Sequence, residues 1–301
     1  MATEIDNKKE RWLSLFEENI RYEKGTVQHD VASIIKDMLL SNQSNNTVRA
    51  TAYQLNTYYW ERNNENGPFF TWAKTGESVP GYISFIIDMI VGPTPFIPYD
   101  DPKQDLLVQL ILELRNLPRN PVKAWDGDHL LPPEETEFGE LLHETWASRW
   151  ADSNREYPDP AKWKQRCDEW VNFSAFLARC VQARIDDDAF DIGKYPRMNI
   201  DDAVSSHITD EVKRNSWVMV AAQYVLLAGP VMDEEFIQKP EVRDLGMSMW
   251  QFWAEGFKKV AEGELASNVK EAVIEARKKM IAMRPELFFV SEGGSKPDAE
   301  E

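Results

Sequence analysis

The most suggestive residues for chemistry are three aspartates in the segment Asp187–Asp191, which reads Asp-Asp-x-x-Asp. This spacing is typical of carboxylates that share one helix face and hold Mg²⁺ against a diphosphate. Such sites need a second motif, Asn/Asp-x-x-x-Ser/Thr-x-x-x-Glu. Asp244 and Ser248 have its spacing, but Phe252 stands where the last carboxylate belongs. We therefore interpret the aspartates as solvated surface at a helix end.

Other motifs for metal binding or catalysis are incomplete. Glu140 and His143 have the Glu-x-x-His spacing of a carboxylate-bridged di-iron site, which requires a second copy that the sequence lacks. A calcium loop beginning at Asp126 fails because Leu131 stands where a glycine must turn the chain. The sequence has no Gly-x-Ser-x-Gly elbow, no glycine-rich phosphate loop and no cysteine beside an obvious base. We expect no metal and no cofactor.

A polar stripe inside an apolar helix is the best candidate for a binding site. Asn172, Phe176 and Arg179 lie on one helical face, because steps of four and three residues realign on a helix. A buried arginine needs a carboxylate, several carbonyl groups or an anionic ligand to compensate its charge. Structural bracing is the favoured interpretation. The candidate ligand-binding residues are Arg179, Asn172, Trp170 and Trp217.

Helical periodicity dominates the elements that must position these residues, and no run shows sustained strand alternation. From Trp170 to Ile185 and from Trp217 to Ala228, apolar residues cover most of the helix circumference, which predicts two central helices buried among others. The sequence predicts helices near 10–22, 26–41, 47–62, 81–91, 103–116, 135–149, 160–188, 200–208, 210–228, 231–237, 240–260 and 263–283.

The expected architecture is one compact all-α domain over residues 1–290, followed by a disordered acidic tail over residues 291–301. The stretches 62–81 and 117–134 are rich in Asn, Gly or Pro and are expected to be long connections. Cys167 and Cys180 are thirteen residues apart in one expected helix, too distant for a disulfide. We expect both to be small buried hydrophobic residues.

Composition narrows the class of protein and its partners. The chain of 301 residues is 43% hydrophobic and 28% charged, which favours an ordinary globular protein. Its net charge of −17 repels nucleic-acid phosphates and anionic lipids, so we expect neither as a partner. The longest apolar run, 217–231, is shorter than the ~20 residues of a bilayer-spanning helix. With no apolar or basic targeting segment at the start, a cytoplasmic location is expected.

Several segments together resemble a known family. The segment Glu169–Arg179 is similar to the signature of a filamentous-fungal family catalogued only as domain of unknown function 3632. Three later features also resemble that family in order and spacing: Trp217–Gly229, Trp250 with Trp253, and Ala272–Met280.

The resemblance covers roughly residues 130–283, and Ser174 departs from it where the family has a second asparagine. It implies a fungal, all-α, intracellular protein and carries no activity that could be transferred.

Two functions from different classes remain open at this point. The first is a non-enzymatic binding or scaffold protein that presents helical grooves and an acidic surface to a basic protein partner. The second is a small-molecule-binding protein, or a cyclase or isomerase without a recognisable motif, that belongs to fungal specialised metabolism. It would bind a small apolar molecule in an aromatic pocket, with Arg179 or Asn172 orienting a polar group. The sequence leaves the oligomeric state open.

Overall fold

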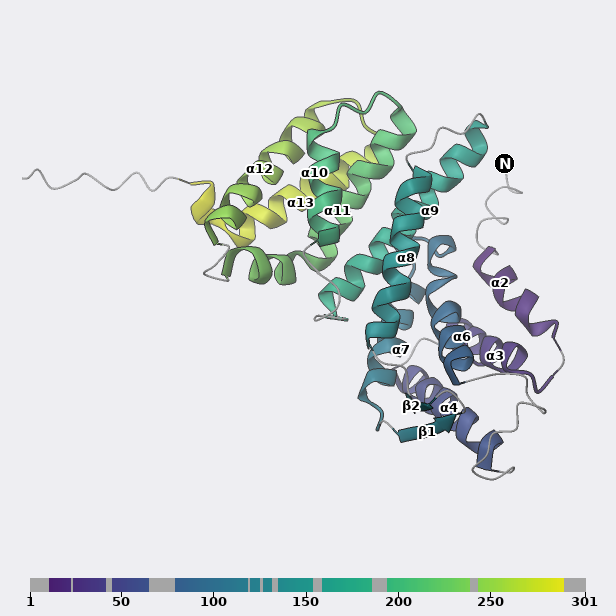
Figure 1. Cartoon of the computed structure of the whole chain (residues 1–301). Helices are drawn as coiled ribbons and strands as arrows, with labels where there is room; N and C mark the ends of the chain where they lie inside the picture. Colours follow the sequence, from purple (N-terminus) through teal and green to yellow (C-terminus); the bar gives the residue numbers. More distant parts are fainter. Residues whose placement is uncertain are drawn as a thin grey trace, which may run out of the picture. The chain divides into compact units, whose positions relative to one another are not determined.

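The structure is a computed structural model that describes residues 11–22, 24–41, 45–64, 79–118, 120–124, 127–131, 135–153, 159–185, 194–238 and 243–289. The chain forms two compact units, Met1–Ile192 and Gly193–Glu301, and each is described by itself (Figure 1).

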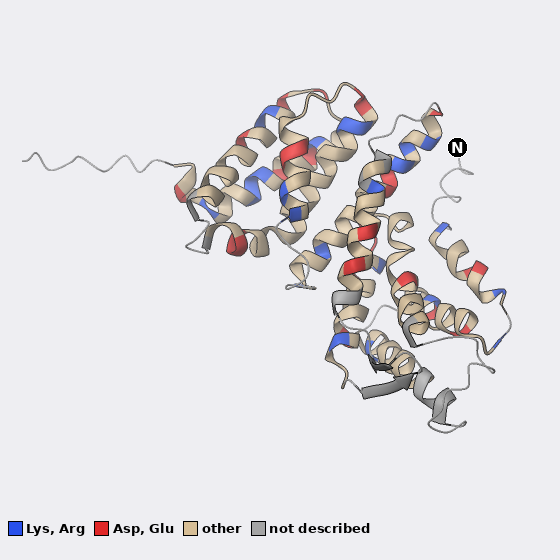
Figure 2. Ribbon diagram, in the orientation of Figure 1, with Lys and Arg blue, Asp and Glu red and all other residues tan. Residues whose placement is uncertain are grey.

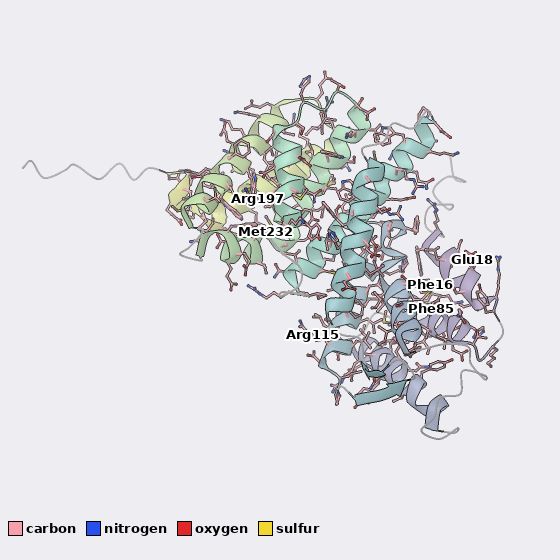
Figure 3. All side chains as sticks on the ribbon, in the orientation of Figure 1. Phe16, Glu18, Phe85, Arg115, Arg197 and Met232 are labelled. Atoms are coloured by element: carbon pink, nitrogen blue, oxygen red, sulfur yellow. The ribbon has the colours of Figure 1, made fainter. Side chains whose placement is uncertain are left out.

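The elements described in the first unit are helices apart from one hairpin. Its elements are α2 (Arg11–Ile20), α3 (Val27–Leu40), α4 (Asn45–Asn64), α6 (Val79–Val91), the 3-10 helix η1 (Thr94–Phe96), α7 (Lys103–Asn116), β1 (Asn120–Ala124), β2 (Gly127–Leu131), α8 (Glu135–Ser153) and α9 (Pro160–Gln182). Burial follows the helical period. On α2, for example, Phe16 is fully buried whereas Glu18 points outward (Figure 3).

Helix α9 is the buried centre of this unit. It begins where the Asp159 side chain accepts hydrogen bonds from the backbone amides of Ala161 and Lys162, and Pro160 occupies the first turn. Its side chains from Trp170 to Ala178 are buried apart from Asn172. The helix packs against α7, α8 and η1.

The second unit is built around α11. Its elements are α10 (Lys194–Ser205), α11 (Glu211–Asp233), the π-helix η2 (Glu234–Gln238), α12 (Arg243–Glu262), α13 (Ser267–Met283) and the 3-10 helix η3 (Pro285–Leu287). Asp210 caps α11 by accepting from the Lys213 amide at 2.6 Å. By length and composition alone, Glu211–Ile237 could cross a membrane, but 78% of its apolar window is buried inside the protein. Such burial is typical of a core helix.

The all-α prediction is confirmed, and each predicted central helix is buried. We expected both helices in one domain, whereas α9 centres the first unit and α11 the second. The predicted tail over residues 291–301 and most of the predicted connection 62–81 lie outside the described residues. Cys167 and Cys180 are buried and unpaired with each other, as predicted, and burial raises the pKa of the Cys180 thiol.

The expectation of an irregular connection over 117–134 is wrong in part, because β1 and β2 pair there as an antiparallel hairpin. Asn120 lies opposite Leu131, and Ala124 lies opposite Gly127. A proline within a strand usually argues against a sheet, yet Pro121 is tolerated because both strands of a two-stranded hairpin are edges.

Gly246 allows α12 to approach η2 closely, and this generates a stability prediction. A Cβ atom at Gly246 would overlap the carbonyl oxygen of Phe236, which is backbone and cannot rotate away. Gly246→Ala should therefore lower the free energy of unfolding by about 1–3 kcal/mol, as measured by urea denaturation. Gly263→Ala is the control, because its Cβ would make only an ordinary 3.4 Å contact with Val260. Equal stability of the two variants would contradict the close approach.

Candidate functional site

Three polar residues form a stripe along the apolar helix α9. Glu169, Asn172 and Arg179 are three and seven residues apart, which places them on one side of the helix. The sequence predicted Asn172 and Arg179 on one helical face, and in the structure both side chains bond to the backbone of Tyr99. The stripe therefore lies against the segment around η1.

Asn172 holds this segment from both of its amide atoms. Its Nδ2 donates to the carbonyl oxygen of Pro95 at 3.0 Å, and its Oδ1 accepts from the amide of Tyr99 at 3.0 Å. Gln104 on α7 is fully buried, and its Nε2 donates to the carbonyl oxygens of Ile97 and Asn172. Together, the two amide side chains satisfy backbone groups that the short η1 helix leaves without intrahelical partners.

Arg179 links three elements through all three of its guanidinium nitrogens. Its Nε donates to the carboxylate of Asp105 on α7 at 2.6 Å, and its Nη2 donates to the carbonyl oxygen of Tyr99 at 3.0 Å. Its Nη1 donates to Gln104 Oε1 and to the carbonyl oxygen of Ala175. These contacts compensate the guanidinium charge within the protein, which favours structural bracing over an anionic ligand at this position.

The four predicted ligand-binding residues are divided between the units. Trp170, Asn172 and Arg179 lie on α9, whereas Trp217 lies on α11 of the second unit. Trp170 is buried, with its ring centre 6.4 Å from that of Trp146. Trp170 and Trp217 thus belong to the cores of separate units. The role of all four residues in binding a ligand stays a prediction.

Sequence reasoning assigned no role to Glu169, which lies at the centre of a charged cluster in the first unit. Its side chain is 4% exposed, and its two oxygens accept from Arg11 and Arg149 at 2.6 Å each. Arg166 lies 3.2 Å from the same carboxylate. The guanidinium of Arg11 also lies 4.4 Å from the ring centre of Phe96. An acidic residue within an apolar helical run was the available signal, but its partners are far away in sequence.

A second missed cluster contains acid–base residue types at the start of α3. Asp30 accepts hydrogen bonds from His29 Nδ1 at 2.7 Å, from the Tyr58 hydroxyl at 2.9 Å and from the Gly25 amide at 3.2 Å. Gly25 has a φ of 93°, a conformation that glycine adopts without a Cβ clash. Although partial burial opposes it, these hydrogen bonds hold the pKa of Asp30 below its ordinary value.

Metal chemistry finds little support in the described part of the chain. Within it, no group of three or more His, Cys, Asp or Glu side chains could hold a metal ion. Glu140 and His143 are both exposed, and the His143 ring stacks on Trp146 at 6.3 Å. The aspartates of Asp187–Asp191 lie outside the described residues.

Comparison with known proteins gives one match. A family model described as a protein of unknown function, DUF3632, matches residues 91–257, which is more than half of the chain. The match includes parts of both units. No curated protein and no solved structure matches the chain.

The bracing role of Arg179 predicts a loss of stability on truncation. Arg179→Ala removes the donors to Tyr99 and Gln104 and should lower the free energy of unfolding by about 2–3 kcal/mol, as measured by urea denaturation. Arg197→Ala is the control, because Arg197 forms only a half-exposed ion pair with Asp201 and should change stability by less than about 0.5 kcal/mol. Wild-type stability of Arg179→Ala would contradict bracing.

The hydrogen bonds to Asp30 predict a pH dependence of stability. Because the folded-state pKa is depressed, the stabilisation is complete above the ordinary carboxyl pKa of 3.8 and is lost as the pH falls through the folded-state value. Asp30→Asn should therefore unfold more easily than wild type at neutral pH, and the difference should shrink below about pH 4. Urea titrations across this range test it. A difference that is constant with pH would contradict the assignment.

Proposed function

The chain belongs to the DUF3632 family of proteins of unknown function, and we propose that it is a binding protein without enzymatic activity that docks a basic amphipathic helix of a protein partner. The docking surface is one exposed face of α12. The proposal includes the cytoplasmic location and the fungal origin that the sequence analysis predicts. A role in specialised metabolism is left to the small-molecule alternative.

The observation that carries this proposal is a set of large apolar side chains left in solvent. Leu245 and Phe252 are 56% and 51% exposed, and they lie on one side of α12 because two helical turns separate them. Phe289 is 66% exposed. Gln251 Nε2 donates to the carbonyl oxygen of Leu287 at 2.6 Å, which holds the chain just before Phe289 against α12. We call Leu245, Phe252 and Phe289 the α12 face.

Exposed apolar side chains that cluster in this way mark protein-binding surfaces more often than scattered ones do. A partner helix with apolar residues at three- and four-residue steps matches a face whose side chains are two turns apart. The α12 face is therefore better suited to a helix than to a small polar ligand.

The charge of the chain supports a basic partner. Acidic residues outnumber basic ones by 51 to 34, and Figure 2 shows them distributed over helices of both units. Two exposed acidic residues lie near members of the α12 face in the sequence. Glu255, which pairs with Lys258, is one turn beyond Phe252, and Glu286, which pairs with Arg284, is three residues before Phe289. Complementary charge accelerates encounter and disfavours acidic partners.

Binding of designed peptides tests the proposal. The probe is a labelled amphipathic peptide of Leu and Lys with one apolar stripe, and its comparison replaces every Lys by Glu. Fluorescence anisotropy should show saturable binding of the Lys peptide to the full chain and little binding of the Glu peptide. Phe252→Asp should weaken binding of the Lys peptide roughly tenfold or more, because it removes the aromatic side chain that the bound peptide would bury.

Tyr53→Asp is the matched control, since Tyr53 is also 51% exposed but lies on α4 of the first unit. Both variants add one negative charge, which by itself attracts a basic peptide, so a loss confined to Phe252→Asp identifies the apolar contact. Absence of binding to wild type, or equal binding by Phe252→Asp and Tyr53→Asp, would overturn the proposal.

A further inference from the structure

Two buried hydrogen-bond donors near the start of α11 have no acceptor in the part of the chain that the structure describes. They are the indole Nε1 of Trp217 and the guanidinium Nε of Arg214. Trp217 is 8% exposed. A buried donor without an acceptor loses its hydrogen bonds to water and gains nothing in return, so such groups are rare.

The residues that carry the two donors are three positions apart on α11. Residues three apart on a helix lie side by side, and long side chains lean toward the helix N-terminus. The contact between Lys213 and Trp217 confirms this direction, because the Lys213 Nζ lies 4.6 Å from the centre of the Trp217 ring. The Trp217 side chain therefore covers the turn that carries both Lys213 and Arg214.

The acceptors closest in sequence are used elsewhere or point away. The Asp210 carboxylate caps the helix by accepting from the Lys213 amide, and Asn215 Oδ1 accepts from the Ala266 amide at 3.0 Å. Glu211 is exposed, and among the described residues its carboxylate forms no ion pair with Arg214, although their spacing would allow one. Among the described residues, no carboxylate pairs with Arg214.

Several comparable groups have acceptors. Trp250 Nε1 donates to the carbonyl oxygen of Met280 at 3.2 Å, and Trp253 Nε1 donates to Asp201 at 2.6 Å. Arg284 makes two hydrogen bonds to Asp233, and every nitrogen of Arg179 has an acceptor. The Arg214 and Trp217 donors at the first turns of α11 thus differ from these groups.

We infer that Arg214 and Trp217 bind an oxyanion, the carboxylate or phosphate group of a small molecule. The Arg214 guanidinium supplies charge and a planar set of donors, which suits both groups. The Trp217 indole supplies one directed N–H, and Lys213 adds positive charge beside its ring. This site is independent of the α12 face, and either can fail without the other. It deepens the sequence prediction that named Trp217 as a ligand-binding residue.

Nuclear magnetic resonance of the full chain labelled with ¹⁵N-tryptophan tests the site. Trp217→Phe identifies the Trp217 indole resonance by its disappearance. Titration with inorganic phosphate and, separately, with succinate distinguishes the two oxyanion classes, and sodium chloride at equal ionic strength controls for screening. We expect one of the two anions to shift the Trp217 indole resonance saturably. Arg214→Gln should weaken that binding roughly tenfold or more, because it removes a charge-assisted contact.

Arg197→Gln is the matched control, because Arg197 lies on a neighbouring helix and makes only a half-exposed ion pair with Asp201. It should leave the binding curve unchanged. Retention of the Trp250 and Trp253 indole resonances in Arg214→Gln shows that the second unit is still folded. No saturable shift with either anion, or an unchanged curve in folded Arg214→Gln, would overturn the inference.

Discussion

The first unit depends on compensating one negative charge inside its core. Glu169 is buried on α9, and guanidinium groups from α2, α8 and α9 surround its carboxylate. Leaving one member of a buried ion pair without its partner typically costs roughly 3–5 kcal/mol, so these elements can separate only at that expense. The arginine of α2 comes from 158 residues earlier in the chain and ties the first described helix to the central one. The same requirement explains the contacts of Asn172 and Arg179, whose polar atoms bond to backbone groups around η1.

The second unit follows this rule at several buried polar groups. Asp233 and Arg284 form a two-point ion pair, and the Trp253 indole donates to Asp201. Arg214 and Trp217 differ from these groups, because each has a buried nitrogen without an acceptor in the described residues. Such donors are costly to bury, and an acceptor from outside the chain would remove that cost. The contrast between Arg179 and Arg214 thus separates a structural arginine from a binding one.

The sequence predicted the helices well because their burial is periodic. The helix expected over 263–283 runs from Ser267 to Met283, and Val273, Ala276 and Met280 form its buried stripe. The hairpin was missed because prolines dominate its region, although Asp126-Gly127 is a known hairpin signal. At the candidate site, periodicity placed Asn172 and Arg179 on one face. It could not identify Asp105 as the partner of Arg179, because 74 residues separate them and tertiary packing alone brings them together.

The family match includes some of the features described above and leaves out others. The matched residues 91–257 include Asn172, Arg179, the donors of α11 and two members of the α12 face, Leu245 and Phe252. They exclude Arg11 and Phe289. The match therefore covers neither the α2 anchor nor the third member of the α12 face. The donors of α11 lie wholly inside the match, whereas the α12 face extends beyond it at Phe289.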